Sequence, residues 1–389
     1  MDTFAFIIHP INPKRDVSRK YPLLGKVVSE RQINALCQFF PPVYISEIEG
    51  ITSASTGKQI KGWFVACPLT PQRMLQLPEK TVYRKIIETG HLAEKLGANI
   101  LGLGAFTSVV GDGGVTIARA LDVPVTSGDS YTVAVAVQAV RQAAELMSIP
   151  LQNATAAVVG ATGAIGRVCS QLLSNDVGRL VLIGRKMEML EALRVELQSE
   201  HVHAEVSTST GMEVLREAQL ILTVTSALHA VVHPEHLQPG SVVCDVARPR
   251  DVSAQVAATR DDILVIDGGM VDVPGESDFH FDFGFPPGKS YACMAETMAL
   301  ALEGRFEDYT LGKKITRARV EEITAIAERH GFRLSGFRSF ERPVTMEQIE
   351  KIKNAAKKTA ASKKNGRRFK PGAKVFQAAA RTNQGYPGG

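Results

Sequence analysis

The sequence lacks paired cysteines, membrane-length apolar runs and a leader-like start, and each absence excludes a class of protein. Its five cysteines are scattered and include no Cys-x-x-Cys pair, so we expect neither a disulfide framework nor a zinc site, and no bound metal. No uninterrupted apolar run approaches the length of a membrane span. The first ten residues hold no basic stretch and no cleavage site, so we expect a cytoplasmic protein.

Acidic residues are absent from 351–389, a segment that holds eleven Lys and Arg residues. The whole chain has a net charge of +5, and subtracting those eleven charges leaves residues 1–350 at −6. We expect 351–389 to be a basic tail, disordered beyond one or two helical turns and dispensable for the core. We expect the tail to be a solvated extension. The alternative is that it contacts anionic lipid or an acidic carrier protein. A nucleic-acid partner is not expected.

Strand-like and helix-like runs alternate along the 389 residues, which indicates an α/β protein with mostly parallel sheets. We expect an N-terminal α/β substrate domain, a linking helix, a Rossmann-like doubly wound dinucleotide-binding domain, and C-terminal helices that pack back on the body. Their predicted bounds, in that order, are 1–128, 129–150, 151–288 and 289–350. The linking helix has Asp129 or Ser130 as its predicted N-cap.

The most informative motif is the apolar strand 156–159, which runs into a turn with Gly-x-x-Gly-x-x-Gly spacing. Such glycines permit a tight turn, close approach of a pyrophosphate, and close packing of the following helix. The N–H groups and dipole at the start of that helix favour phosphate. We therefore predict a dinucleotide site, to which we also assign two residues at later strand ends. The predicted cofactor-binding residues are Gly160, Ala161, Thr162, Gly163, Ala164, Ile165, Gly166, Thr225 and Gly269.

The end of the next predicted strand indicates which dinucleotide binds. An NAD site carries Asp or Glu there, about 20 residues after the turn, for the ribose 2′-hydroxyl. This chain has Arg185 and Lys186 instead, and two cations suit a 2′-phosphate, so we predict NADPH as the cofactor. The alternative for Lys186 is that it only opens a solvated helix and leaves the phosphate to Arg185.

Cys293 is the cysteine with the clearest chemical context. It lies in the first turn of a predicted helix, just after a Gly/Pro-rich loop. We expect the helix dipole and the nearby Lys289 to favour the thiolate, which is the nucleophilic form. Inert packing is the alternative, since free cysteines are among the most buried residues. Cys67 is the rival nucleophile because it follows a predicted strand, where α/β sheets open onto their ligands.

Two loops that follow predicted strands carry small and hydroxylated residues. They span 102–111 and 125–132 and include Thr107 and Ser127. Their N–H and hydroxyl groups could bind a carbonyl or a phosphate. Ordinary strand-to-helix loops with capping residues are the alternative.

Together these motifs resemble the long-chain acyl-[acyl-carrier-protein] reductases of the cyanobacterial, fatty aldehyde-forming type. The resemblance runs from about Gly50 to His330. Its matching blocks are Cys67–Leu69, Gly102–Val110, Thr126–Asp129, Gly160–Gly166, Gly268–Val271 and Ala292–Glu296. The chain departs from the family's pattern at the N-terminus, over 112–114, 247–250 and 274–289, and beyond Lys351.

The resemblance implies a reaction and a set of partners. A fatty acyl thioester, of acyl carrier protein or coenzyme A, would be reduced by NADPH to a fatty aldehyde, with Cys293 as the acylated catalytic nucleophile. Ser127 and Thr107 are then candidate donors to the oxyanion. Acyl carrier protein, a membrane surface and an aldehyde-consuming enzyme are the implied candidate partners.

Two other functions fit the two-domain layout. One is an NADP-dependent dehydrogenase of the shikimate or amino-acid type, which needs a Lys–Asp pair in the first domain and no cysteine. The other is a non-enzymatic NADP(H)-binding protein whose basic tail recruits a partner. An acyl-enzyme on Cys293 is expected only for the acyl-thioester reductase.

Overall fold

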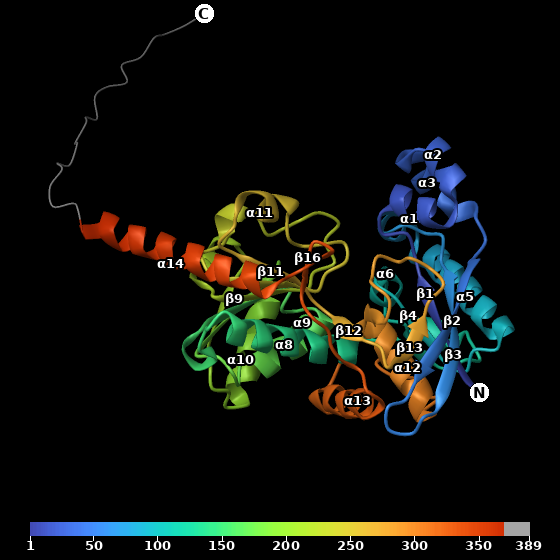
Figure 1. The fold of residues 1–389 in the computed structure, drawn as a ribbon. Coiled ribbons are helices and arrows are strands. Elements are labelled where there is room, and N and C mark those ends of the chain that lie inside the picture. Colours follow the sequence, from blue (N-terminus) through green and yellow to red (C-terminus); the bar gives the residue numbers. More distant parts are fainter. Residues whose placement is uncertain (369–389) are drawn as a thin grey trace, which may run out of the picture.

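Two six-stranded sheets, each covered by helices, make up the computed structural model, which describes residues 1–368. They form two lobes, between which run α8 (Asp129–Leu146) and the segment around β12 (Met270–Asp272) (Figure 1). The predicted α/β class is confirmed by this arrangement.

The first sheet is mixed and has the strand order β13-β2-β3-β1-β4-β5. Its strands are β1 (Asp2–Ile8), β2 (Val43–Thr52), β3 (Gln59–Ala66), β4 (Leu101–Leu103), β5 (Val125–Thr126) and β13 (Gly275–Asp278). The four strands from β3 to β5 are parallel, whereas β2 and β13 each pair antiparallel with their neighbours. Short helices of this lobe are α4 (Pro71–Gln76), α6 (Phe106–Val109) and α7 (Val115–Arg119).

Helices cover both faces of the first sheet. In β1, Ala5 and Ile7 join the apolar core that contains α5 (Glu79–Leu96), whereas Phe4 and Phe6 join the core that contains α12 (Ala292–Glu303). Successive strand residues point to opposite faces, so an apolar run such as β1 requires a helix on each side.

The second sheet is fully parallel, with the order β11-β10-β9-β6-β7-β8. Its strands are β6 (Thr155–Val159), β7 (Arg179–Ile183), β8 (Glu205–Ser209), β9 (Leu220–Thr223), β10 (Val242–Asp245) and β11 (Leu264–Asp267). Its helices are α9 (Ala164–Leu173), α10 (Met187–Ser199) and α11 (Ala254–Thr259), with short 3₁₀ turns at Leu151–Asn153, Glu213–Glu217 and Pro234–His236. This is the strand order of a doubly wound dinucleotide-binding domain, as predicted.

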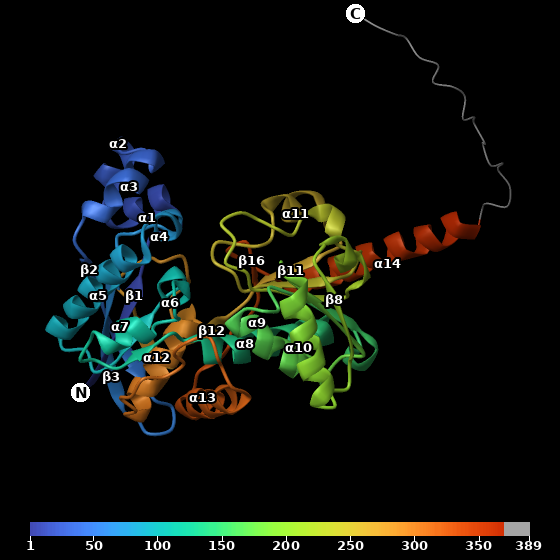
Figure 2. The ribbon, with the colours of Figure 1, turned by 180° about the vertical axis from the view of Figure 1, so that it is seen from behind.

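After β11 the chain returns to the first lobe. β12, β14 (Lys289–Tyr291) and β15 (Arg333–Leu334) form a small antiparallel sheet at this crossing. α12 then packs on β1, β4 and α8, and α13 (Arg317–His330) packs on α8 and α12 (Figure 2). The domain boundary therefore differs from the predicted one at 288, because β13 pairs with β2 in the first sheet.

The C-terminal segment also differs from the prediction. After a hairpin of β16 (Arg338–Ser339) and β17 (Arg342–Pro343), helix α14 spans Met346–Arg368, where a disordered tail was expected from Lys351. Ile349 is 1 % exposed and Ile352 packs against the same core, so the helix starts on the body. The remaining residues of the predicted tail, 369–389, lie outside the described residues.

Three short helices that the sequence analysis did not predict form a cap on the first lobe. They are α1 (Pro13–Lys20), α2 (Pro22–Val27) and α3 (Glu30–Leu36), followed by a 3₁₀ turn at Cys37–Phe39. Asn12 caps α1, and Ser29 with Gln32 forms a capping box on α3. We call residues 13–40 the cap.

Candidate active site

A cleft of about 1290 Å³ lies between the lobes and is lined by residues of both. His9, Gly160, Gly184 and Thr225 line it, and each lies just beyond the carboxyl end of a parallel strand. Open α/β sheets bind their ligands at this edge. The volume exceeds the roughly 300–1,000 Å³ of a pocket for one small ligand, so a dinucleotide and a second substrate fit together.

The predicted glycine turn lies at the second-lobe end of the cleft. Gly160, Thr162, Gly163, Ala164 and Ile165 line it. Gly163 is the N-cap of α9 and no side chain caps the helix, so its first N–H groups are available to phosphate oxygens.

Two of the predicted turn residues, Ala161 and Gly166, do not line the cleft but allow the turn to pack closely against α9. Ala161 is buried, and a Cβ on Gly166 would lie 2.2 Å from the carbonyl oxygen of Gly160. Gly166 therefore permits the close approach of α9 to the turn, which is the role that the motif gives to its third glycine.

Arg185 and Lys186 follow β7 and line the same end of the cleft. Both are exposed, and neither forms an ion pair within residues 1–368. Lys186 is also the N-cap residue of α10, which agrees with the alternative reading that it opens a helix. No acidic residue follows β7 directly, so the local charge suits a phosphate better than a ribose hydroxyl.

The other two predicted cofactor residues also line the cleft. The N–H and hydroxyl of Thr225 both donate to Asp251, a contact that fixes the loop after β9. The carbonyl of Gly269 accepts from the N–H of Ala292 at 2.8 Å, which ties β12 to the start of α12.

Cys293 lies in the first turn of α12, as predicted, and its side chain lines the cleft. It is partly exposed, whereas the other four cysteines are buried. The rival Cys67 is 0 % exposed, and burial raises the pKa of its thiol to about 12.

The starts of α8 and α12 meet at Cys293. Gly128, in the left-handed conformation with φ of 76°, is the N-cap of α8, so the predicted cap of Asp129 or Ser130 is wrong by one or two residues. A Cβ on Gly128 would lie 2.4 Å from both Cα and Cβ of Cys293. Only glycine permits this approach, which places Asp129 at the cysteine.

The electrostatics at Cys293 differ from the prediction. Burial, followed by the charges of Asp129 and Glu296, raises the pKa of the thiol to about 12, although the N–H groups of Cys293 and Met294 act in the other direction. Lys289 does not assist, because its ammonium contacts Asp272 and Ser335 at 2.5 Å. Near neutral pH Cys293 is therefore a thiol, and it could act as a nucleophile only with a proton acceptor beside it.

Asp129, which the sequence analysis considered only as a cap, is the titratable side chain next to that thiol. It lines the cleft, and burial, with a smaller effect of Glu296, raises its pKa to about 7. Glu296 itself is fully buried and accepts from Thr126 and from the N–H of Tyr131, so it holds the two helix starts together.

The two predicted oxyanion donors are committed elsewhere. The hydroxyl of Ser127 donates to the carbonyl of Thr310 at 2.5 Å, although the residue lines the cleft. The hydroxyl of Thr107 donates to the carbonyl of Gly104 at 2.8 Å, and the residue is 0 % exposed and does not line the cleft. The alternative reading of both as loop-stabilising residues fits the structure.

Comparison with known proteins identifies a family that matches the second lobe and relatives that match most of the chain. The Shikimate / quinate 5-dehydrogenase family matches residues 139–267, which cover most of the second lobe. "Aminotransferase PigE" of a Serratia species is 34 % identical over 306 residues, which are 78 % of this chain and 36 % of that protein. The chain thus spans little more than a third of this relative.

A second relative matches along nearly its whole length. The "Long-chain acyl-[acyl-carrier-protein] reductase" of Synechococcus elongatus is 32 % identical over 347 residues, which are 85 % of this chain and 98 % of that protein. The chain belongs to the long-chain acyl-[acyl-carrier-protein] reductase family. It is an oxidoreductase with a nicotinamide-dinucleotide-binding fold. Among solved structures, L-tryptophan dehydrogenase from Nostoc punctiforme is similar with a TM-score of 0.38 and 13 % identity, over 94 % of this chain and 89 % of that one.

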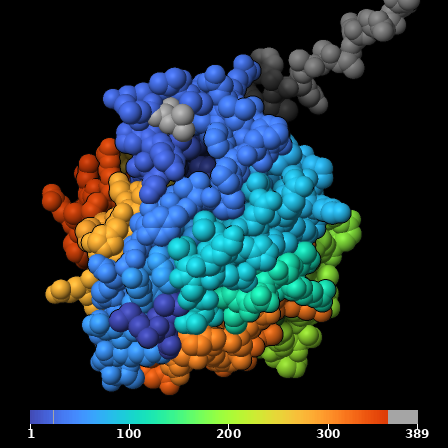
Figure 3. Space-filling model, turned by 90° about the vertical axis from the view of Figure 1, so that its right-hand side faces the viewer, coloured from blue at the N-terminus to red at the C-terminus, as the bar shows by residue number. Residues whose placement is uncertain are grey.

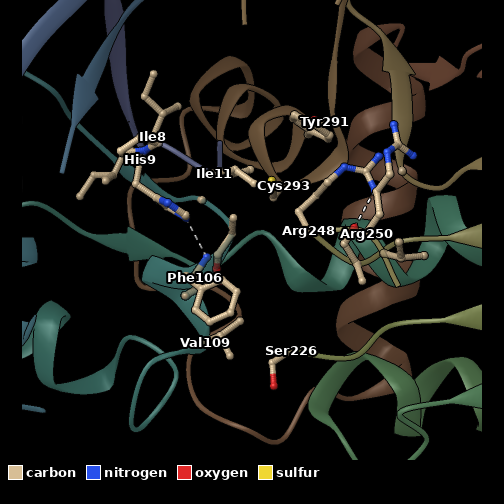
Figure 4. A pocket seen from close by; sticks show the side chains of 18 of the residues that line it. Ile8, His9, Ile11, Phe106, Val109, Ser226, Arg248, Arg250, Tyr291 and Cys293 are labelled. Atoms are coloured by element: carbon tan, nitrogen blue, oxygen red, sulfur yellow. Dashed lines mark hydrogen bonds between the residues drawn. The ribbon is translucent and has the colours of Figure 1, made fainter. Parts of the chain in front are cut away.

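In this member of the reductase family, the sequence analysis missed several residues that line the cleft. The Arg248 guanidinium lies 5.6 Å from the ring centre of Tyr291, the N-cap residue of α12, and both lie in the same part of the cleft as Cys293 (Figure 4). His9 accepts from the N–H of Phe106 at 3.1 Å, and burial lowers its pKa to about 4, so it is neutral near pH 7. Arginines and histidines that follow strand ends were the available signal for both.

Apolar side chains line the first-lobe end of the cleft. Phe281, Phe283 and Phe285 belong to the aromatic loop before β14, and Phe283 packs on Phe64 with ring centres 5.3 Å apart. Ile45 of β2 and residues of the cap complete this wall. Within residues 1–368, no cluster of three or more His, Cys, Asp or Glu is placed to hold a metal, and no helix is long and apolar enough to cross a bilayer.

Proposed function

We propose that the protein reduces a fatty acyl thioester to a fatty aldehyde with NADPH, through an acyl group carried by Cys293. The observation that carries the proposal is the place of Cys293. It is the partly exposed cysteine of the chain, at a helix start, in the cleft that also contains the glycine turn and a wall of phenylalanines.

The residues at the second-lobe end fit NADPH. The uncapped start of α9 offers N–H groups to the pyrophosphate, and Arg185 and Lys186 are exposed cations without an ion pair in residues 1–368. When bound, the cofactor supplies the hydride that converts the acyl-cysteine to a thiohemiacetal.

Asp129 is the proton acceptor in this proposal. Its carboxylate takes the Cys293 proton as the sulfur adds to the thioester carbonyl, and it returns that proton to the departing carrier thiol. A group with a pKa of about 7 is suited to both steps near neutral pH. Collapse of the thiohemiacetal anion releases the aldehyde and the Cys293 thiolate, which takes up one proton from solvent, through Asp129, to restore the resting thiol.

Charge on the reacting carbonyl oxygen needs donors other than Ser127 and Thr107. The N–H groups of Cys293 and Met294, in the first turn of α12, and the Arg248 guanidinium are the donors beside the thiol, since the N–H of Ala292 is bonded to Gly269. Donors fixed in place before the reaction stabilise such an oxyanion without reorganisation.

The apolar wall supports a fatty acyl group as the substrate. A fatty chain attached to Cys293 would lie along the phenylalanines of the loop before β14, and the hydrophobic effect favours such burial by about 0.8 kcal/mol for each methylene. Longer acyl chains should therefore bind more tightly until the wall ends.

Steady-state kinetics test this function. The protein is mixed with acyl-coenzyme A thioesters of increasing length, and NADPH consumption and aldehyde formation are followed together. We expect equal amounts of both, an increase of kcat/KM with chain length, and no turnover in Cys293→Ser. Cys67→Ser is the matched control and should keep its activity.

A dehydrogenase of the shikimate type is the second candidate, because that family matches residues 139–267. It needs a Lys–Asp pair in the cleft. The Lys–Asp ion pairs of residues 1–368 are Lys58 with Asp2 and Lys289 with Asp272, and none of these four residues lines the cleft. Oxidation of shikimate or quinate with NADP⁺ by the Cys293→Ser protein would support this candidate over the first.

A further inference from the structure

Exposed apolar side chains gather on the cap. Leu23, Val27 and Phe39 are 79 %, 83 % and 75 % exposed, and Leu36 and Phe40 are about half exposed. Elsewhere in the described residues, large exposed apolar side chains are mostly single, as on ordinary protein surfaces. A group of them on one short segment marks an interaction surface.

The cap is basic although the body of the protein is acidic. Residues 13–40 contain six Lys or Arg residues and two acids, against a net charge of −6 for residues 1–350. Asp16, one of the two acids, is paired with Arg15 and Arg19. Lys14, Lys26 and Arg31 are exposed and form no ion pair within residues 1–368. The cap thus presents positive charge beside projecting apolar side chains.

The cleft reaches this surface. Tyr21, Leu36 and Phe40 are exposed, and they also line the cleft that contains Cys293. The cap stands at the top of the face shown in Figure 3, at the end of the first lobe. If the proposed function holds, a fatty product would leave the cleft beside the projecting apolar residues. The apolar surface itself is observed independently of that function.

We propose that the cap docks on an anionic lipid bilayer. Leu23, Val27 and Phe39 insert between the lipid headgroups, and Lys14, Lys26 and Arg31 contact the lipid phosphates. Basic residues beside projecting apolar ones are the pattern of an interfacial anchor, in which apolar burial and attraction to anionic lipid add. An acidic protein would match the same charge, and the experiments below distinguish it from a bilayer.

Sedimentation with vesicles tests the apolar part. The full chain is mixed with phosphatidylcholine vesicles that contain about a quarter phosphatidylglycerol, and with pure phosphatidylcholine vesicles. We expect binding to the anionic vesicles, and a loss of at least roughly tenfold in the triple variant Leu23→Ser, Val27→Ser and Phe39→Ser. The matched control replaces apolar residues exposed elsewhere: Leu75→Ser, Val195→Ser and Phe306→Ser.

Charge variants test the electrostatic part in the same full chain. The triple variant Lys14→Gln, Lys26→Gln and Arg31→Gln should bind anionic vesicles roughly tenfold or more weakly than the parent. Each basic residue near an anionic surface contributes about 1 kcal/mol to binding. The control variant carries Lys80→Gln, Lys95→Gln and Arg342→Gln and should bind like the parent. NADPH binding in every variant reports that the second lobe is folded.

Three results would overturn the proposal. The first is that the parent binds neither kind of vesicle. Cap variants that bind like the parent would show that another basic segment, such as 351–389, holds the lipid. The third is that the parent binds an acidic acyl carrier protein but no vesicles, and that the cap variants lose this binding. That result would identify a protein partner. Vesicle binding needs no thioester, so these results are independent of the proposed reaction.

Discussion

Replacing Gly128 by alanine should disable Cys293 while the protein stays folded. The new Cβ would lie 2.4 Å from Cα and Cβ of Cys293 and 2.7 Å from its carbonyl oxygen. Ordinary contacts begin at 3.4 Å, so the starts of α8 and α12 must separate by about 1 Å. A misplacement of that size can cost about a hundredfold in rate, and we expect kcat/KM on an acyl thioester to fall by that factor.

Gly97→Ala is the matched control. Gly97 also has a left-handed backbone, with φ of 88°, but a Cβ there meets nothing within 4 Å. Both variants carry the same backbone penalty of roughly 1–2 kcal/mol, which thermal unfolding measures. Alkylation of Cys293 by a small thiol reagent gives a second readout that needs no substrate, and its rate should change only in Gly128→Ala. Parent-like kinetics and alkylation in Gly128→Ala would refute the reasoning.

Three further outcomes follow from the site and the fold. Asp129→Asn should lower the acylation rate about a hundredfold and abolish its rise with pH through about 7, because the pKa raised by burial means that the carboxylate forms only above that value; an unchanged profile would exclude Asp129 as the base. Arg185→Ala should weaken NADPH binding about tenfold or more and NADH binding little, since a charged contact to phosphate contributes roughly 1.5–3 kcal/mol; equal weakening, measured by titration, would make the residue structural. Ile349→Ala should lower the free energy of unfolding by roughly 2–5 kcal/mol in a denaturant titration, and no change would show that α14 does not pack on the body.

The parts of the fold that were predictable have local signals. The glycine turn before α9 depends on residues close in sequence and lies where the sequence predicts. Helices α5 and α13 end at Gly97 and Gly331, and glycine at a helix end is likewise a local signal. The strands of the doubly wound sheet are short apolar runs that need no partner to be recognised.

The parts that were missed depend on distant partners or on short elements. The cap helices have six to eight residues, too few for a clear apolar period. Strand β13 is defined by pairing with β2, more than two hundred residues earlier. The tail composition suggested disorder, but Ala and Lys also favour helix, and Ile349 attaches α14 to the body.

The same limit applies to the site. Cys293 and the glycine turn could be selected from local context, whereas the partners of Ser127 and Lys289 could not. Ser127 donates to Thr310, 183 residues away, and Lys289 contacts Asp272 across a strand pair. Asp129 reads as a helix cap until the fold brings Cys293 beside Gly128.

Mass spectrometry of the intact protein after mixing with a long-chain acyl-coenzyme A tests the central claim most directly. Without NADPH, we expect a mass increase of one acyl group, located on Cys293 by peptide mapping and absent from Cys293→Ser. Addition of NADPH should remove the adduct and release the aldehyde. An adduct on Cys67, an adduct that persists in Cys293→Ser, or no adduct in a protein that still forms aldehyde would contradict the account.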